Sequence, residues 1–62
     1  MEFWICRKEK GPQWMVRRDG QIYGDYLDRQ QALLDAVEAA KDAFETGQDV
    51  QVWDSSTNAR VF

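Results

Sequence analysis

The 62-residue sequence has no histidine and a single cysteine, Cys6. Without histidine or a second cysteine, one chain cannot assemble the usual zinc or haem ligand sets, and it cannot close an internal disulfide. We therefore expect no metal and no cofactor. A lone thiol on a predicted strand is most often a small buried hydrophobe, and a reactive Cys6 would need a neighbouring cation such as Arg7 or Lys8.

Long hydrophobic runs are also missing. The apolar run near the N-terminus, Phe3 to Cys6, has four residues, which is far too short for a signal peptide or a membrane span. Together with the absence of disulfides, this predicts a cytoplasmic protein with no membrane partner. A hydrophobic fraction of 44% with eight aromatic residues is too rich for a disordered chain. The sequence thus predicts one small globular domain over residues 1–62.

The sequence between Leu27 and Gly47 predicts one amphipathic helix. Asp28 is a suitable N-cap, and Gln31 three residues later completes a capping-box pattern. Gly47 can adopt the left-handed conformation that ends a helix. Apolar residues recur between them at steps of three and four, which predicts a helix over 29–46 with one apolar stripe.

Strands are predicted on both sides of this helix. Residues 3–8, 14–18 and 21–23 are rich in aromatic and β-branched residues, and 50–53 is a fourth such segment. The third strand either ends at Tyr23 or continues to Tyr26 past a bulge or bend at Gly24. Asp19-Gly20 predicts a tight type I′ hairpin turn, and a second turn is expected at 10–13, where Pro12 fixes φ. Residues 59–62 form a short fifth strand or a frayed tail. The fold class is therefore α+β: a three- to five-stranded antiparallel sheet, in the order β-β-β-α-β-(β), covered on one face by the helix.

Alternation along the strands divides the sheet into two faces. The face toward the helix and the helix stripe together give the predicted core: Phe3, Ile5, Trp14, Val16, Ile22, Leu33, Ala36, Val37, Ala40, Phe44, Val50 and Val52. The opposite face carries Trp4, Cys6, Met15, Tyr23 or Tyr26, and Trp53. That face is too apolar to be left in water. We therefore expect an interaction face made of Trp4, Met15 and Trp53.

Charge is distributed unevenly along the chain, whose net charge is −3. Residues 1–20 hold five cations against three carboxylates, whereas residues 21–62 hold three cations against eight carboxylates. The helix carboxylates Asp35, Glu38, Asp42 and Glu45 share a solvated face with Lys41. Without histidine there is no conventional base to activate Ser55, Ser56 or Thr57, which are better explained as turn residues, so we expect no enzyme activity.

Trp14-x-Val16, Asp19-Gly20 and the alanine-rich capped helix resemble a small bacterial family, the one catalogued as domain of unknown function 2188. The alanines that carry the resemblance are Ala32, Ala36, Ala39, Ala40 and Ala43. The similarity covers roughly residues 3–53, with Pro12-Gln13 where that family usually has glycine. It implies the fold, and it implies no activity.

Three antiparallel strands followed by an alanine-rich helix are also similar in layout to the plant AP2-type and phage-integrase arm-type DNA-binding domains. In those domains, arginine and tryptophan side chains on the sheet contact DNA. Trp4, Arg17 and Arg7 would occupy comparable positions here.

Two functions follow as hypotheses. The first is a non-enzymatic interaction module that pairs with itself or another protein through the aromatic sheet face, since a small domain gains core by pairing. Pairing of strand edges is a variant of this idea. The second is nucleic-acid binding through Arg7, Arg17 and Arg18, although a pI of 4.7 lies far from the basic balance that such domains show.

Overall fold

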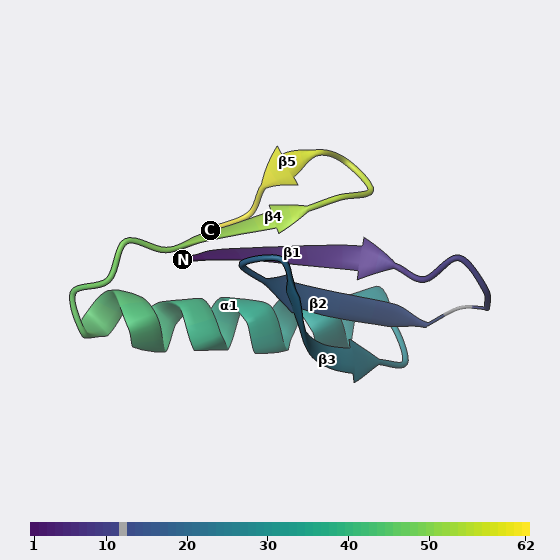
Figure 1. The fold of residues 1–62 in the computed structure, drawn as a ribbon, viewed down its shortest axis with the longest axis horizontal. Helices are drawn as coiled ribbons and strands as arrows, with labels where there is room; N and C mark the ends of the chain where they lie inside the picture. The colour runs from purple at the N-terminus through teal and green to yellow at the C-terminus, as the bar shows by residue number, and fades with distance from the viewer. Residues whose placement is uncertain (12) are drawn as a thin grey trace.

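The computed structural model describes residues 1–11 and 13–62 of the chain. Three strands, β1 (Glu2–Arg7), β2 (Trp14–Arg18) and β3 (Gln21–Tyr26), precede helix α1 (Arg29–Glu45). Strands β4 (Gln51–Asp54) and β5 (Ala59–Arg60) follow it. Figure 1 shows α1 lying along one face of the sheet, with β5 at the edge farthest from β3. The predicted α+β fold is confirmed, and within the described residues the fifth strand is present.

The strands form one sheet in the order β3-β2-β1-β4-β5. Neighbouring strands are antiparallel except for the pair of β1 and β4, which is parallel. The sheet is thus mostly antiparallel, as predicted. The parallel pair arises because α1 crosses the sheet and returns the chain to the end at which β1 began, as a crossover helix does.

Local sequence chemistry sets the ends of these elements. Asp19 and Gly20 both have positive φ, 50° and 84°, as the predicted type I′ turn requires. Of the predicted turn at 10–13, Pro12 lies outside the described residues. The side chain of Asp28 accepts from the backbone N–H of Gln31 at 2.9 Å, which confirms the N-cap.

The helix C-terminus has the hydrogen bonds of a Schellman motif. Gly47 has φ of 87°, its N–H donates to the Phe44 carbonyl at 3.0 Å, and the Gln48 N–H donates to the Ala43 carbonyl at 3.1 Å. Thr46 is the C-cap, so the helix ends one residue before the predicted 46. Glycine is required here because the left-handed conformation strains residues that carry a Cβ.

The core lies between α1 and the sheet. Its buried apolar residues are Phe3, Ile5, Val16, Ala32, Ala36, Ala40, Val50 and Val52. Trp14, Leu33 and Val37, which were predicted to be core, are partly buried against this cluster. The centre of the buried helix face consists of alanines, whose small side chains let the helix backbone approach the strands closely.

Two core predictions are wrong, since Ile22 is 66% exposed and Phe44 is 65% exposed. A bulge explains Ile22: Val16 lies opposite Gly24 but Arg17 lies opposite Ile22, so Tyr23 is an extra residue in β3. Ile22 is thereby directed away from the helix, and Tyr23 packs edge-on against Phe3, with ring centroids 5.5 Å apart.

Phe44 is exposed for a different reason. It lies in the last turn of α1, and Figure 1 shows this end of the helix extending past the strands. Its aromatic contact is with the Phe62 ring, edge to face at 6.4 Å. The apolar stripe read from the sequence therefore runs longer than the sheet that could bury it.

Candidate functional site

Helix α1 contacts β1, β2, β3 and β4 from one side and leaves the opposite side of the sheet uncovered by any described element. We call this opposite side the outer face. Strand alternation and the observed registers place ten side chains on it: Glu2, Trp4, Cys6, Met15, Arg17, Ile22, Asp25, Gln51, Trp53 and Arg60. The predicted interaction residues Trp4, Met15 and Trp53 are all among them.

A row of five side chains, one from each strand, crosses the outer face. Arg17 lies opposite Ile22 on one side and Trp4 on the other, Trp4 lies opposite Trp53, and Trp53 lies opposite Arg60. We call these five residues the central row. The row has two indoles at its middle, an arginine on each side of them and one exposed isoleucine at its end.

The two indoles form a stacked pair. Their ring centroids are 5.4 Å apart with an angle of 12° between the planes. Trp4 Nε1 donates to Glu2 Oε1 at 2.7 Å, and Trp53 Nε1 donates to Gln51 Oε1 at 3.0 Å. Because both N–H groups already have acceptors, a partner that covers the pair would leave no indole donor unsatisfied. The pair therefore offers a mainly apolar surface that is already ordered.

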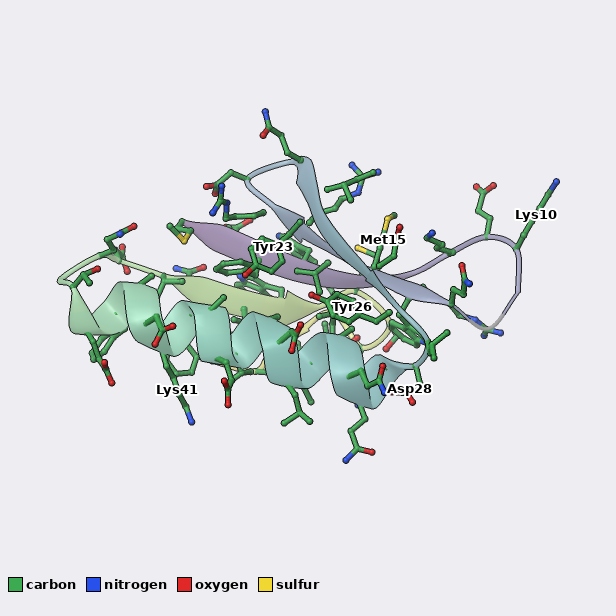
Figure 2. The ribbon with its side chains drawn as sticks, turned by 90° about the horizontal axis from the view of Figure 1, so that it is seen from below. Lys10, Met15, Tyr23, Tyr26, Asp28 and Lys41 are labelled. Atoms are coloured by element: carbon green, nitrogen blue, oxygen red, sulfur yellow. The ribbon has the colours of Figure 1, made fainter. Side chains whose placement is uncertain are left out.

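Beside the central row, the outer face has two polarisable sulfur side chains and little net charge. Cys6 lies opposite Met15, and both side chains are half-buried. Asp25 lies opposite Met15 on the other side and forms an ion pair with Lys8 at 2.9 Å. Figure 2 shows Met15 on the side of the strands away from α1. Thioether and thiol groups adapt well to a partner surface, since both are polarisable and uncharged.

The arginines predicted to contact nucleic acid do not gather on one face. Arg17 lies on the outer face, but Arg18 follows it in β2 and lies opposite Phe3 on the helix side. The Arg18 guanidinium stands 5.8 Å from the centroid of the Tyr23 ring. Arg7 lies opposite Trp14, also on the helix side. Arg60, which the sequence reasoning missed, takes a place on the outer face beside Trp53.

A signal for Arg60 is present in the sequence. If β4 and β5 pair symmetrically about the polar turn at 55–58, Ala59 falls opposite Asp54 and Arg60 falls opposite Trp53, and the structure shows these two pairs. The turn contains Asn58 with a φ of 53°, a conformation that asparagine tolerates better than most residues. Aligning the two strands about this turn would have predicted that Arg60 lies beside Trp53 on the outer face.

An open depression of about 610 Å³ borders the outer face near the start of β1. It is lined by Met1, Glu2, Trp4, Asp19, Gly20, Asp49 and Gln51. Two of its three carboxylates are already engaged: Glu2 accepts from Trp4, and Asp19 Oδ1 accepts from the Glu2 backbone N–H at 2.9 Å. Residues 1–11 and 13–62 contain no group of three or more acidic, cysteine or histidine ligands placed to hold a metal ion. The depression therefore forms an acidic border to the outer face.

A buried carboxylate on the helix side, which the sequence analysis did not single out, positions β5. Asp54 is fully buried, and its Oδ2 accepts from Arg29 Nε at 2.9 Å and from the Arg29 terminal nitrogen. Its Oδ1 accepts from the Ser56 N–H at 2.9 Å and the Ser56 hydroxyl at 2.6 Å. Burial acts to raise the pKa of Asp54, but the hydrogen bonds from Ser56 and Arg29 and the charge of Arg29 hold it below its usual value.

Tyr26 fills the space between β3 and α1, as Figure 2 shows. Burial, followed by the neighbouring carboxylate of Asp35, raises the pKa of Tyr26 to about 12. The ring lies over Gly24, where an added Cβ would stand 2.8 Å from the tyrosine hydroxyl oxygen. This close approach explains why β3 has glycine at that position.

No family model, curated protein or solved structure matches this chain. The resemblances to domain of unknown function 2188 and to the AP2-type domains stay predictions. In the described part of the chain, no helix is both long and apolar enough to cross a membrane.

Proposed function

We propose that this chain is a non-enzymatic interaction module of the cytoplasm that self-associates through its outer face. The observation that carries the proposal is the stacked Trp4–Trp53 pair at the centre of a sheet face that no described element covers. Tryptophan is enriched among residues that dominate binding energy, especially near the centre of an interface.

The size of the molecule supports this function. An interface of ordinary size takes roughly 800 Å² from each partner, which is under a fifth of the 4328 Å² of accessible surface here. A chain of this length buries a smaller fraction of its surface on folding than larger domains do. Association through the outer face would extend its limited core across a second molecule.

The edges of the sheet favour association through the face over pairing of strands. At one edge β5 has two residues, and at the other β3 is interrupted by the bulge at Tyr23 and by Gly24. Short edge strands and bulges are the features that suppress edge-to-edge pairing. Among the routes to self-association, the outer face is therefore the best supported.

Sedimentation equilibrium over a wide concentration range tests the proposal. We expect a reversible oligomer, and we expect Met15→Glu to weaken association by about tenfold or more, as charges placed in an apolar interface do. Leu27→Ala is the matched control, because Leu27 is an exposed apolar residue in the β3–α1 connection, outside both the outer face and α1. A wild-type chain that stays monomeric at millimolar concentration would contradict the proposal, as would loss of association in the control alone.

A second candidate function is binding of single-stranded nucleic acid, favoured by one observation. Arg17 and Arg60 flank the stacked indoles in the central row, and cations beside aromatic platforms are how such proteins hold backbone and bases. The net charge of −3 and the acidic border oppose it.

Fluorescence titration with a mixed-sequence oligonucleotide at low and high salt tests this second function. Binding should weaken steeply with salt and with Arg17→Ala or Arg60→Ala, since each phosphate contact releases counterions. Arg18→Ala, on the helix side, is the control and should leave affinity unchanged. Binding that is absent or independent of salt removes this candidate.

A further inference from the structure

We infer that the outer face of one copy docks on the exposed side of helix α1 of a second copy, in a head-to-tail contact. This inference rests on the proposed self-association and names the surface that the outer face recognises. The alternative for the same function is a symmetric contact between two outer faces.

Charge complementarity is the first argument. The central row carries two cations, Arg17 and Arg60, and no carboxylate, and beside it the charges of Lys8 and Asp25 cancel in an ion pair. The exposed side of α1 carries three carboxylates, Glu38, Asp42 and Glu45, against Lys41. Figure 2 shows Lys41 directed away from the sheet. Sheet-to-helix docking joins the two arginines of the central row to carboxylates, whereas two outer faces paired row to row would bring arginine beside arginine.

An apolar contact point lies among these carboxylates. Leu34 is 57% exposed although it lies in the middle of the helix. Glu38 and Lys41 follow it at four and seven residues, so the three share one side of α1. A leucine beside Glu38, on the acidic side of α1, complements a face that has two indoles at its centre and an arginine on each side of them.

The dimensions of the two surfaces agree. Helix α1 has 17 residues, which gives a length of about 25 Å. Figure 1 shows α1 running along the strands, and the six-residue strands β1 and β3 are about 20 Å long at about 3.3 Å per residue. The chain's own α1 already covers the inner face of this sheet, so a second helix of equal length covers the outer face. The result is a sheet with one helix on each face.

This geometry has a consequence for the size of the assembly. A head-to-tail contact uses a different surface on each copy, so every added molecule leaves one outer face and one helix side free. Association then continues beyond two copies, into chains or rings. A symmetric contact between outer faces would stop at the dimer.

Two complementary variants distinguish these modes in sedimentation or light scattering. Met15→Glu blocks the outer face, and the double variant Leu34→Lys/Glu38→Lys blocks the helix side at two exposed positions. We expect each variant alone to be monomeric and an equimolar mixture to form a 1:1 dimer and nothing larger. Glu9→Lys, in the exposed β1–β2 connection, makes the same charge change as Glu38→Lys and should change affinity less than about twofold.

Each other outcome is informative. If the helix-side variant associates like the wild type while Met15→Glu does not, the proposed function stands and the head-to-tail contact is overturned. If the wild type itself is monomeric, the proposed function fails as well. Circular dichroism spectra that match the wild type establish that each variant is folded.

Discussion

Replacing Asp54 by asparagine should remove a large part of the free energy of unfolding. The Asp54 side chain is fully buried, and both of its oxygens accept hydrogen bonds, from Arg29 on one side and Ser56 on the other. An asparagine keeps the shape but replaces one acceptor oxygen with an N–H₂ donor. Either the Arg29 donors or the Ser56 donors then face another donor.

The magnitude follows from the partners. Hydrogen bonds to a charged group contribute about 1.5–3 kcal/mol, and a buried group left without its partner adds a desolvation penalty. Arg29 is 43% exposed and can recover hydration, which reduces the loss. We therefore expect Asp54→Asn to cost about 2–3 kcal/mol. A domain of this length has a total stability of roughly 3–9 kcal/mol, so the variant should approach marginal stability.

Urea unfolding followed by tryptophan fluorescence measures this difference. With a slope of about 1 kcal/mol per molar urea, the midpoint should fall by about 2–3 M. The matched control is Asp25→Asn, because Asp25 pairs with Lys8 at 2.9 Å but its side chain is 59% exposed. An exposed pair contributes about 0–1 kcal/mol. Equal midpoints for the Asp54 and Asp25 variants would refute the reasoning.

The loss of stability at acid pH gives an independent check on the role of the Asp54 carboxylate. The pKa of Asp54 is lower in the folded chain than its ordinary value of 3.8. The stabilisation is therefore fully present above pH 3.8 and is lost as the pH falls through the folded-state pKa. Asp54→Asn should lose less stability than the wild type over this range. Parallel acid curves would show that the Asp54 carboxylate does not contribute.

Three further predictions concern Gly24, Tyr26 and Gly47. Gly24→Ala should cost about 1–3 kcal/mol in urea unfolding, because its Cβ would lie 2.8 Å from the Tyr26 hydroxyl; an unchanged midpoint would contradict this. The pKa of Tyr26, about 12, exceeds the ordinary 10.0, so the stability of the fold should fall as the pH rises from 10 to 12. Thermal melts should show a smaller fall over this range for Tyr26→Phe than for the wild type. Gly47→Ala should cost about 1 kcal/mol, because φ there is 87°, and a wild-type melting temperature would refute that.

Features set by neighbouring residues were the ones that the sequence could predict. The Asp28 cap, the Asp19-Gly20 turn and the Gly47 stop each depend on the conformational preferences of a few consecutive residues. Burial of Ile22 was mispredicted because the β3 bulge depends on how Tyr23 and Gly24 fit against β2 and Tyr26. A shift of one residue reverses the face of every later side chain. Simple alternation cannot locate such a shift.

The candidate site was predictable in part for the same reason. Alternation placed Trp4, Met15 and Trp53 on one face, although their arrangement into a row needed the parallel pairing of β1 with β4. Arg17 and Arg18 are consecutive in a strand, so alternation already separates them. The Asp54–Arg29 pair spans 25 residues, and nothing local in the sequence indicates it.

The buried carboxylate on the inner side also determines what the outer face presents. Asp54 accepts hydrogen bonds from Ser56 in the β4–β5 turn and from Arg29, the first residue of α1, and so connects the turn to the helix. The turn sets the register that brings Arg60 opposite Trp53. Because strand alternation puts Asp54 and Trp53 on opposite faces, the interior charge pair fixes the position of an exterior cation. Perturbing Asp54 should therefore weaken any binding that depends on Arg60 even while the chain remains folded.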